Sequence, residues 1–326
     1  MSQNIQDLSK LISSLGGKPT SNVVNAQQAF QNMSSTGIKI WGNPQTKKKV
    51  ALGISLGGHL YFFGPAGVGK STMARAILEG ARLPYYRFQG YEGFTADDWY
   101  GSATLDSDGK IVVNYSSMVK AVEEGCPVLV EEMNFIQPTQ MGPLFSFLDD
   151  TPWVDVTVAG KTRRVVKKKG FRLMVTANDN GSGDQLHIYG GGQILNRALA
   201  SRFSMFIDIP YLNADDETDM IIAKTGLAEK DVLKAMMQVA EQTRKLAAAE
   251  PSKAELAISP RSMLDWARVI LVNDESKAGL DHMSMAIPVL VARLPEGLQD
   301  TVRTFVSNAF GNRLPLTDLK RVPVTA

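Results

Sequence analysis

The chain has 326 residues, enough for one large domain or two modest ones, each with its own apolar core. Its 35 Lys and Arg residues against 33 Asp and Glu leave a formal net charge of +2, which argues against a strongly basic nucleic-acid-binding protein. The single cysteine, Cys126, excludes an internal disulfide and a cysteine-based zinc site, and the three histidines lie too far apart to suggest a metal site.

Residues 1–45 form a polar N-terminal region rich in Ser, Asn and Gln. Apolar residues recur there at helical spacing, at Ile5, Leu8, Leu11, Ile12 and Leu15. We expect a short helix, either docked on the main body or binding an adaptor, and then a linker that ends in Lys47–Lys49. The sequence starts without a signal-peptide pattern and contains no apolar run near the ~20 residues that cross a bilayer, so we expect a cytoplasmic protein with no membrane partner.

From residue 46 to 211, short apolar strands alternate with helical patterns, which is typical of an α/β fold with a parallel sheet covered by helices. The candidate strands are His59–Phe63, Tyr85–Phe88, Val128–Glu131, Phe171–Thr176 and Met205–Ile209. Four of them end where polar residues begin, at the sheet edge where α/β proteins bind ligands. From 212 to 326 the strand signals disappear, and we expect a separate all-helical domain.

A phosphate-loop motif follows the first strand and matches G-x-x-x-x-G-K-[ST] at every fixed position. It consists of Gly64, Pro65, Ala66, Gly67, Val68, Gly69, Lys70 and Ser71. Its glycines let backbone N–H groups and a helix N-terminus face the phosphates of ATP. We expect Lys70 at the β- and γ-phosphates, the Ser71 hydroxyl on Mg²⁺ and Thr72 in the first helical turn of the site. The flanking strand and helix disfavour the alternative, an ordinary glycine-rich turn.

Two adjacent carboxylates, Glu131 and Glu132, follow the apolar run at 127–130. Downstream of a phosphate loop, this pattern favours a Walker B segment over a solvated acidic turn. Glu131 would hold Mg²⁺ through its water shell, and Glu132 would orient and polarise the attacking water. The usual first acid is Asp, so Glu131 is one methylene longer than expected.

Three further polar residues are candidates for the same site. Asn178 ends another apolar strand and could position the attacking water, although Asn is also common as a turn former. Arg197 and Arg202 lie in a helical stretch before the last strand, where an arginine could reach the ATP of an adjacent subunit. From the residues alone, ordinary surface arginines are the commoner explanation.

Arg261 is a candidate in the helical region. Ser259 suits an N-cap and Pro260 a first helical position, which places Arg261 in the first turn. A cation there opposes the helix dipole, which suggests either an external anion such as a γ-phosphate or a nearby carboxylate partner.

Taken in order, these segments resemble the MoxR-like branch of AAA+ ATPases, and within it the small ATPase subunits of aerobic cobaltochelatases. The resemblance rests on GPAGVGKS at 64–71, LVEEMN at 129–134, FRLMVTANDNGSGD at 171–184, Tyr189, Gln193, Asn196, Arg202 and SPRSMLDWA at 259–267. It implies an AAA+ core with a helical lid, working as a ring, usually a hexamer. It assigns Asn178 as sensor one, Arg202 as the arginine finger and Arg261 as sensor two, with Arg197 as a second candidate for a contact in trans.

The resemblance also accounts for two insertions that face the pore or the partner in this family. Residues 153–158 and 162–166 predict a β-hairpin ahead of sensor one, and residues 99–115 predict an insertion within the helix after strand two. Residues 161–169 carry six positive charges, which could grip an acidic partner or nucleic acid, or could be a solvated edge.

We therefore predict an oligomeric Mg-ATPase that remodels a partner protein, with a von Willebrand factor A-domain protein as the first candidate partner. The alternatives are the motor subunit of a metal chelatase, a less favoured nucleic-acid-dependent motor, and a nucleotide-gated binding module that barely hydrolyses ATP.

Overall fold

The computed structural model describes residues 41–42, 44–80, 83–183, 192–311 and 317–324. Within it the chain divides into two compact units. The first contains Pro44–Gly64 and Lys70–Ile209, and the second contains Pro210–Ala326, with which the short segments Trp41–Asn43 and Pro65–Gly69 group. The amphipathic helix expected near the N-terminus lies outside the described residues.

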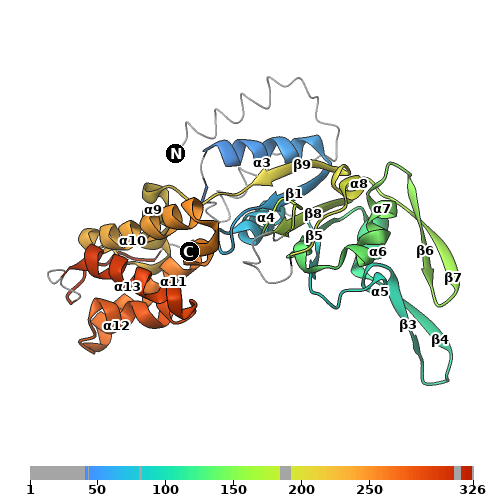
Figure 1. Ribbon diagram of the computed structural model, residues 1–326. Coiled ribbons are helices and arrows are strands. Elements are labelled where there is room, and N and C mark those ends of the chain that lie inside the picture. The colour runs from blue at the N-terminus through green and yellow to red at the C-terminus, as the bar shows by residue number, and fades with distance from the viewer. Residues whose placement is uncertain (1–40, 43, 81–82, 184–191, 312–316, 325–326) are drawn as a thin grey trace. The chain divides into compact units, whose positions relative to one another are not determined.

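A five-stranded parallel sheet in the order β2-β5-β8-β1-β9 forms the centre of the first unit (Figure 1). Its strands are β1 His59–Phe63, β2 Tyr86–Gln89, β5 Pro127–Glu131, β8 Arg172–Ala177 and β9 Phe203–Asp208. Every residue of β5 and β8 is buried, so both faces of the sheet are covered there, which explains their continuous apolar runs. The predicted α/β fold is confirmed; β1 has the predicted ends, and the ends of the other strands lie within two residues of the prediction.

The first described helix corrects the sequence analysis. Lys47–Lys49 do not end a linker, because they lie inside helix α3, Pro44–Leu56. Proline suits a helix start, where its missing N–H has no intrahelical acceptor. Val50 and Ile54, one turn apart, are buried, and α3 packs against β9. The three lysines are thus the polar side of a helix whose other side belongs to the core.

The remaining helices of the first unit connect the strands. They are α4 Lys70–Gly80, α5 Ala96–Tyr100, α6 Ser117–Glu124, α7 Gly142–Leu148 and α8 Arg197–Ala200, with short 3₁₀ turns η1 Met133–Phe135 and η2 Pro138–Met141. Helix α4 packs against β5, β8 and β1, so the segment that follows the phosphate loop is fixed over the middle of the sheet.

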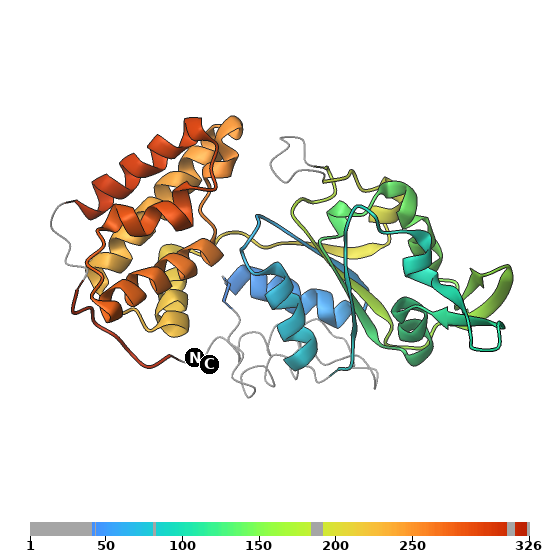
Figure 2. The ribbon, with the colours of Figure 1, turned by 90° about the horizontal axis from the view of Figure 1, so that it is seen from below.

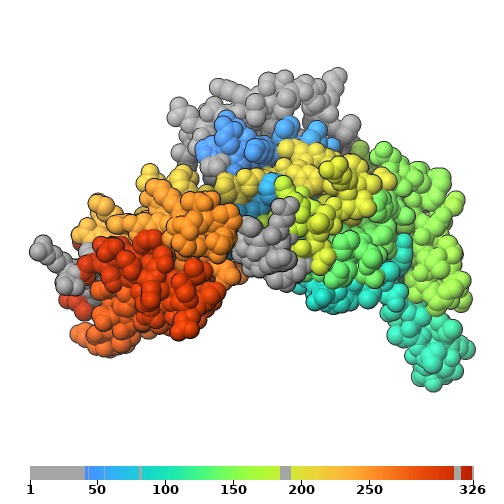
Figure 3. Space-filling view, in the orientation of Figure 1, coloured from blue at the N-terminus to red at the C-terminus, as the bar shows by residue number. Residues whose placement is uncertain are grey.

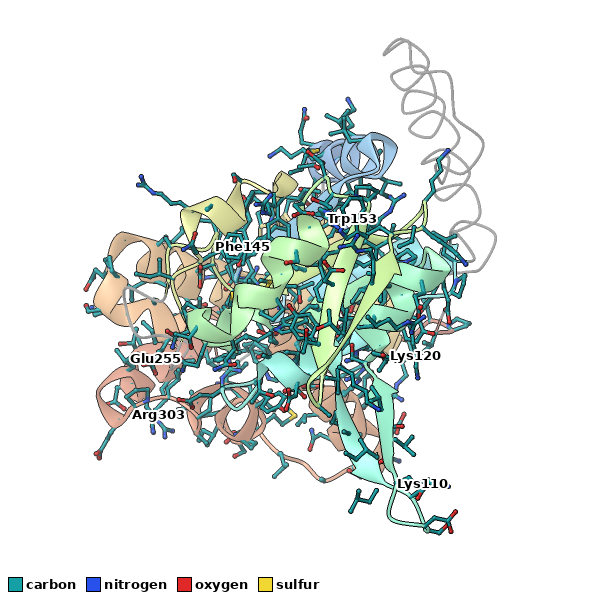
Figure 4. The ribbon with its side chains drawn as sticks, turned by 90° about the vertical axis from the view of Figure 1, so that its right-hand side faces the viewer. Lys110, Lys120, Phe145, Trp153, Glu255 and Arg303 are labelled. Carbon is teal, nitrogen blue, oxygen red and sulfur yellow. The ribbon has the colours of Figure 1, made fainter. Side chains whose placement is uncertain are left out.

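Two β-hairpins extend from the first unit (Figure 1). One pairs β3 Gly101–Leu105 with β4 Ile111–Tyr115 between α5 and α6, and the other pairs β6 Trp153–Val158 with β7 Lys161–Val166. The space-filling view shows the β3–β4 hairpin as a narrow projection, and Lys110 marks its tip in the side-chain view (Figures 3 and 4).

The second unit is a helical domain whose helices pack around one apolar core that includes Trp266 and Met236 (Figure 2). Its helices are α9 Ala214–Thr225, α10 Lys230–Ala249, η3 Pro251–Leu256, α11 Pro260–Ser276, α12 His282–Ala286, η4 Ile287–Val291 and α13 Glu296–Phe310. In the described part of the chain, none of the helices combines the length and hydropathy that crossing a bilayer requires.

Candidate nucleotide-binding site

The phosphate loop joins the carboxyl end of β1 to the start of α4. Gly64, Gly67 and Gly69 all have positive φ values, of 145°, 76° and 97°, which L-residues with side chains rarely adopt. Gly64 also packs so closely on Ile209 that an added Cβ would collide with its carbonyl oxygen. The backbone conformation of the loop therefore requires these glycines. The loop leads directly into the N-terminus of a helix, which is the arrangement that binds anions.

Lys70 is buried and lies at the junction of this loop with the neighbouring strand. Its Nζ donates hydrogen bonds to the Gly64 carbonyl oxygen and to Asn178 Oδ1, both at 2.9 Å. A buried ammonium group is retained only where acceptors or anions compensate its charge. Lys70 is thus held at the mouth of the phosphate loop by groups that a phosphate oxygen can replace.

Asn178, which follows β8, links the lysine to the acidic end of β5. Its Nδ2 donates to Glu132 Oε2 at 3.0 Å, while its Oδ1 accepts from Lys70. The backbone N–H of Asn178 also donates a hydrogen bond to Asn134 Oδ1 at 3.2 Å. This bond fixes the backbone of Asn178, and with it the starting point of the Asn178 side chain. The structure therefore brings Lys70, Asn178 and Glu132 together in one hydrogen-bonded chain, as expected from the shared sheet edge.

Glu132 leaves the end of β5 in a left-handed conformation, with φ 55°. Such a backbone costs roughly 1–3 kcal/mol in a non-glycine residue and persists only where its surroundings fix it. Gly90 packs against the Glu132 carbonyl with no room for a Cβ, and the Glu132 N–H donates to Thr176 Oγ1 at 3.3 Å. This strained turn directs the Glu132 carboxylate toward Asn178 instead of back along the strand.

Thr176 is a functional candidate that the sequence analysis missed. It is fully buried in β8, and its hydroxyl lies 3.3 Å from both the Ser71 hydroxyl and the Glu132 backbone nitrogen. One side chain therefore ties the phosphate loop to the acidic turn. The only available signal was a hydroxyl residue inside an otherwise apolar strand, which does not reveal its partners before the strand order is known.

Glu131, the last residue of β5, is also buried. Its carboxylate pairs with Arg87 Nε on β2 and lies 4.0 Å from Arg75 Nε on α4. Arg75 Nε in turn donates to the Ser71 carbonyl oxygen at 3.3 Å, so Glu131 and Ser71 share one neighbourhood. The sequence analysis missed both arginines, because neither belongs to a recognised motif.

The residues present fit a magnesium ion held together with a nucleotide. Mg²⁺ prefers oxygen ligands and is usually held by one or two carboxylates plus substrate phosphates and waters. Ser71 offers a hydroxyl and Glu131 a carboxylate at the same sheet edge. Within the described ranges no group of three or more His, Cys, Asp or Glu could hold a metal by itself.

Arg202 lies away from this edge of the sheet. It precedes Phe203, which pairs with His59 at the start of β1, whereas the phosphate loop follows the other end of that strand. Its guanidinium lies over the Phe145 ring at 5.5 Å, and its buried Nε finds no hydrogen-bond partner among the described residues. Arg202 therefore does not join the site formed by Lys70.

Arg197 begins α8, whose N-cap Asn196 accepts from the Ala198 N–H. The Arg197 side chain is exposed and forms no ion pair with the described residues.

Arg261 lies in the helical unit, in the first turn of α11. The predicted cap is confirmed: Ser259 Oγ accepts from the Ser262 N–H at 3.2 Å, and Pro260 is the first helical residue. Arg261 is exposed and has no carboxylate partner in the part of the chain that is described. The expected conflict between its charge and the helix dipole is thus not resolved by an internal ion pair.

Residues 59–203 match the family described as the AAA domain of the dynein-related subfamily. This segment is an AAA+ ATPase domain. The match spans the phosphate loop, both acids and Asn178 and ends just after Arg202, so the AAA+ domain includes every candidate described above except Arg261.

The AAA+ domain has relatives among characterised proteins. Aerobic cobaltochelatase subunit CobS of Sinorhizobium sp is 27% identical over 208 residues, which are 62% of this chain and 61% of that protein. Midasin of Dictyostelium discoideum is 30% identical over 166 residues, which are 49% of this chain and 3% of midasin. A solved putative ATPase from Cytophaga hutchinsonii aligns at 16% identity with a TM-score of 0.45, over 90% of this chain and 95% of its own. The predicted resemblance to a CobS-like, MoxR-like AAA+ ATPase is confirmed.

Proposed function

We propose that this protein binds Mg-ATP at the phosphate loop, hydrolyses it, and uses the energy to remodel a partner as a ring-shaped oligomer. The observation that carries the proposal is the hydrogen-bonded chain Lys70–Asn178–Glu132, because it joins a phosphate-binding cation to a carboxylate suited to activate water.

On this proposal the bound triphosphate replaces the internal acceptors of Lys70. The phosphate-loop N–H groups and the Lys70 ammonium bind the β- and γ-phosphate oxygens. Glu132 accepts a hydrogen bond from the attacking water and polarises it, while Asn178 fixes the carboxylate and contacts the γ-phosphate. Mg²⁺, when bound, neutralises phosphate charge, and Ser71 and Glu131 are the residues that would hold it.

Ring assembly would give Arg202 and Arg197 a role. Arg202 immediately precedes β9 at the end of the sheet opposite the phosphate loop, so it does not serve the nucleotide of its own subunit in this arrangement, and Arg197 is exposed at the start of α8. In an oligomer with nucleotide at the subunit interface, either could supply positive charge to the γ-phosphate of a neighbour. A hexamer is the arrangement expected from the family resemblance. Arg261 would act from the helical lid.

The partner is proposed to be a protein, with a von Willebrand factor A-domain protein as the first candidate. The likeness to a cobaltochelatase subunit favours a second candidate, in which this chain drives a metal chelatase whose other subunits bind the tetrapyrrole. The chain spans 61% of that relative, so this role needs its own test.

A nucleic-acid partner is less well supported than the charge count of the β6–β7 hairpin suggests. Arg163 pairs with Glu123, Arg164 makes two hydrogen bonds to Asp155, and Lys167 pairs with Asp149. Three of the six positive charges predicted there are therefore already neutralised by neighbouring carboxylates. The expectation is that DNA or RNA does not stimulate ATP hydrolysis.

The test compares three proteins by steady-state ATP hydrolysis, nucleotide binding and sedimentation. We expect Lys70→Ala to lose nucleotide binding, and Glu132→Gln to retain ATP, cease turnover and sediment as a stable ring. Lys120→Ala, an exposed lysine on α6, is the matched control and should behave as wild type. Unchanged turnover in Glu132→Gln, or unchanged ATP binding in Lys70→Ala, would contradict the proposal.

A further inference from the structure

The arginine pair around Glu131 is the feature of the site that the phosphate-loop chemistry leaves unexplained. The Glu131 side chain is only 4% exposed, yet the Arg87 side chain that pairs with it is 52% exposed. Arg87 is the second residue of β2, an edge strand whose backbone runs parallel to β5 with Arg87 opposite Leu129. The pair therefore joins the surface of the sheet edge to its buried acidic end.

The two carboxylate oxygens of Glu131 have different surroundings. Oε2 accepts a hydrogen bond from Arg87 Nε, on the β2 side. Oε1 lies 4.0 Å from Arg75 Nε, which itself donates to the Ser71 carbonyl oxygen. Oε1 is thus on the side of α4 and the phosphate loop, and Oε2 is on the side away from it.

This division matters because glutamate has one more rotatable bond than aspartate. A free Glu side chain at this position would lose more rotamer entropy on being fixed than an Asp would, and its carboxylate could occupy more than one position. A guanidinium is a rigid planar donor that fixes a carboxylate in orientation as well as in charge. Partners of this kind commonly orient the groups that hold metals.

We propose that Arg87 is a positioning residue for the magnesium site: by binding Oε2 it turns Oε1 of the longer Glu131 toward Ser71. The inference rests on the proposed nucleotide site and adds a residue to it. Arg75 contributes less to the orientation of Glu131, because its hydrogen bond goes to the Ser71 backbone carbonyl oxygen. Arg87 does not touch the reacting groups itself.

A purely structural role for Arg87 predicts something different. If Arg87 only compensates the charge of a buried carboxylate, its loss lowers the stability of the protein whether residue 131 is a glutamate or an aspartate. If it positions Oε1, its loss weakens metal binding only while residue 131 is a glutamate. An aspartate at 131 is one methylene shorter, so we expect that it does not reach Arg87 and that the arginine then has nothing to position.

A double-mutant cycle on the full-length protein separates these roles. The variants are Arg87→Gln, Glu131→Asp and the pair together, with ADP as the nucleotide so that turnover plays no part. The readout is the Mn²⁺ affinity of the protein–ADP complex from electron paramagnetic resonance, with Mg²⁺ competition as a check. We expect Arg87→Gln to weaken Mn²⁺ binding about tenfold, at the low end for residues that orient metal ligands. In the Glu131→Asp background the same change should have no effect.

Controls make each outcome decisive. Arg163→Gln removes a similarly exposed arginine, 46% against 52%, from an ion pair on the hairpin, and should leave Mn²⁺ affinity unchanged. If Arg87→Gln does not fold, Arg87→Lys takes its place with the same expected sign, because a lysine lacks the planar fork. An unchanged Mn²⁺ affinity in Arg87→Gln, or an equal loss in both backgrounds, would overturn the inference. Failure of the wild-type protein to bind ADP would instead overturn the proposed function.

Discussion

Asn178 donates its amide to Glu132 Oε2 at 3.0 Å while accepting from Lys70 at 2.9 Å. One short polar side chain therefore connects the Glu132 carboxylate to the Lys70 ammonium, which on our proposal exchanges its internal acceptors for phosphate oxygens. This relationship leads to the first prediction.

Replacing Asn178 with Ala should lower kcat for ATP about a hundredfold and change ATP affinity little. The Glu132 carboxylate would lose the donor that fixes it, whereas the loop N–H groups and Lys70 would still bind phosphate, and general-base contributions are on the order of 10²–10⁴. Steady-state kinetics and equilibrium nucleotide binding measure the two effects separately. Asn114→Ala, on the β3–β4 hairpin, removes a comparable side-chain hydrogen bond to Thr104 and should leave kcat unchanged. Equal losses of kcat and of ATP affinity would argue against this role of Asn178.

Thr176→Val should lower kcat about tenfold at nearly constant ATP affinity. Valine has nearly the same shape, but it leaves the Glu132 N–H without its acceptor and the Ser71 hydroxyl without its neighbour, a loss of about 1–3 kcal/mol. Thr176→Ser keeps the hydroxyl and should restore most of the rate. Thr157→Val removes the hydroxyl of an exposed threonine pair on the β6–β7 hairpin and is the matched control. Wild-type turnover in Thr176→Val would show that the hydroxyl does not matter.

The β3–β4 hairpin should contact the partner through its apolar face. Leu105 and Ile111 are direct cross-strand partners near the tip and are 69% and 56% exposed, an unusual placement for large apolar side chains. Changing both to Ser should reduce capture of the partner by the Glu132→Gln protein at least tenfold while basal ATP hydrolysis stays the same. Val112→Ser, on the opposite face of the hairpin, is the control. Loss of basal hydrolysis in the double variant would place the hairpin in the ATPase site instead.

A feature of the structure can be predicted from the sequence when the residues that determine it are close together in the chain. The phosphate loop can be predicted because its glycines, lysine and serine lie within eight residues, and its backbone conformation depends on these residues alone. Strands β5 and β8 can be predicted because both of their faces are buried, and strands buried on both faces are continuous apolar runs. By contrast, the pairing of Arg87 with Glu131 depends on β2 lying next to β5, and the contacts of Thr176 depend on β8 lying between β5 and β1. Strand order is a tertiary property, so these residues carry no recognisable local signal.

The Lys47–Lys49 error has the same origin. Three consecutive lysines resemble a solvated linker when the chain is scanned alone, but the helix is decided by Val50 and Ile54, whose burial requires the sheet. The charge count of residues 161–169 likewise does not show which of these charges are paired. The carboxylates that neutralise Arg163 and Lys167 come from α6 and from the end of α7 and are far away in sequence.

We predict that His59 makes the stability of the first unit depend on pH. Its pKa is lowered from 6.5 to about 4, first by burial and then by the nearby charges of Lys167 and Arg172, which outweigh the opposite effect of Asp150. Its Nδ1 also accepts a hydrogen bond from the Leu173 N–H at 2.9 Å, an acceptor that protonation removes.

The sign of the effect follows from proton uptake. Between pH 6.5 and about 4 the unfolded chain binds a proton at His59 that the folded chain does not, so the free energy of unfolding falls as the pH falls through this window. The loss approaches roughly 3 kcal/mol at its acid end, from about 1.4 kcal/mol per pKa unit. His59→Asn keeps an acceptor near Leu173 but cannot be protonated, and should lose less stability across the same range. Urea unfolding at pH 7, 5.5 and 4.5 measures the difference. Parallel curves for the wild type and His59→Asn would mean that this histidine does not contribute.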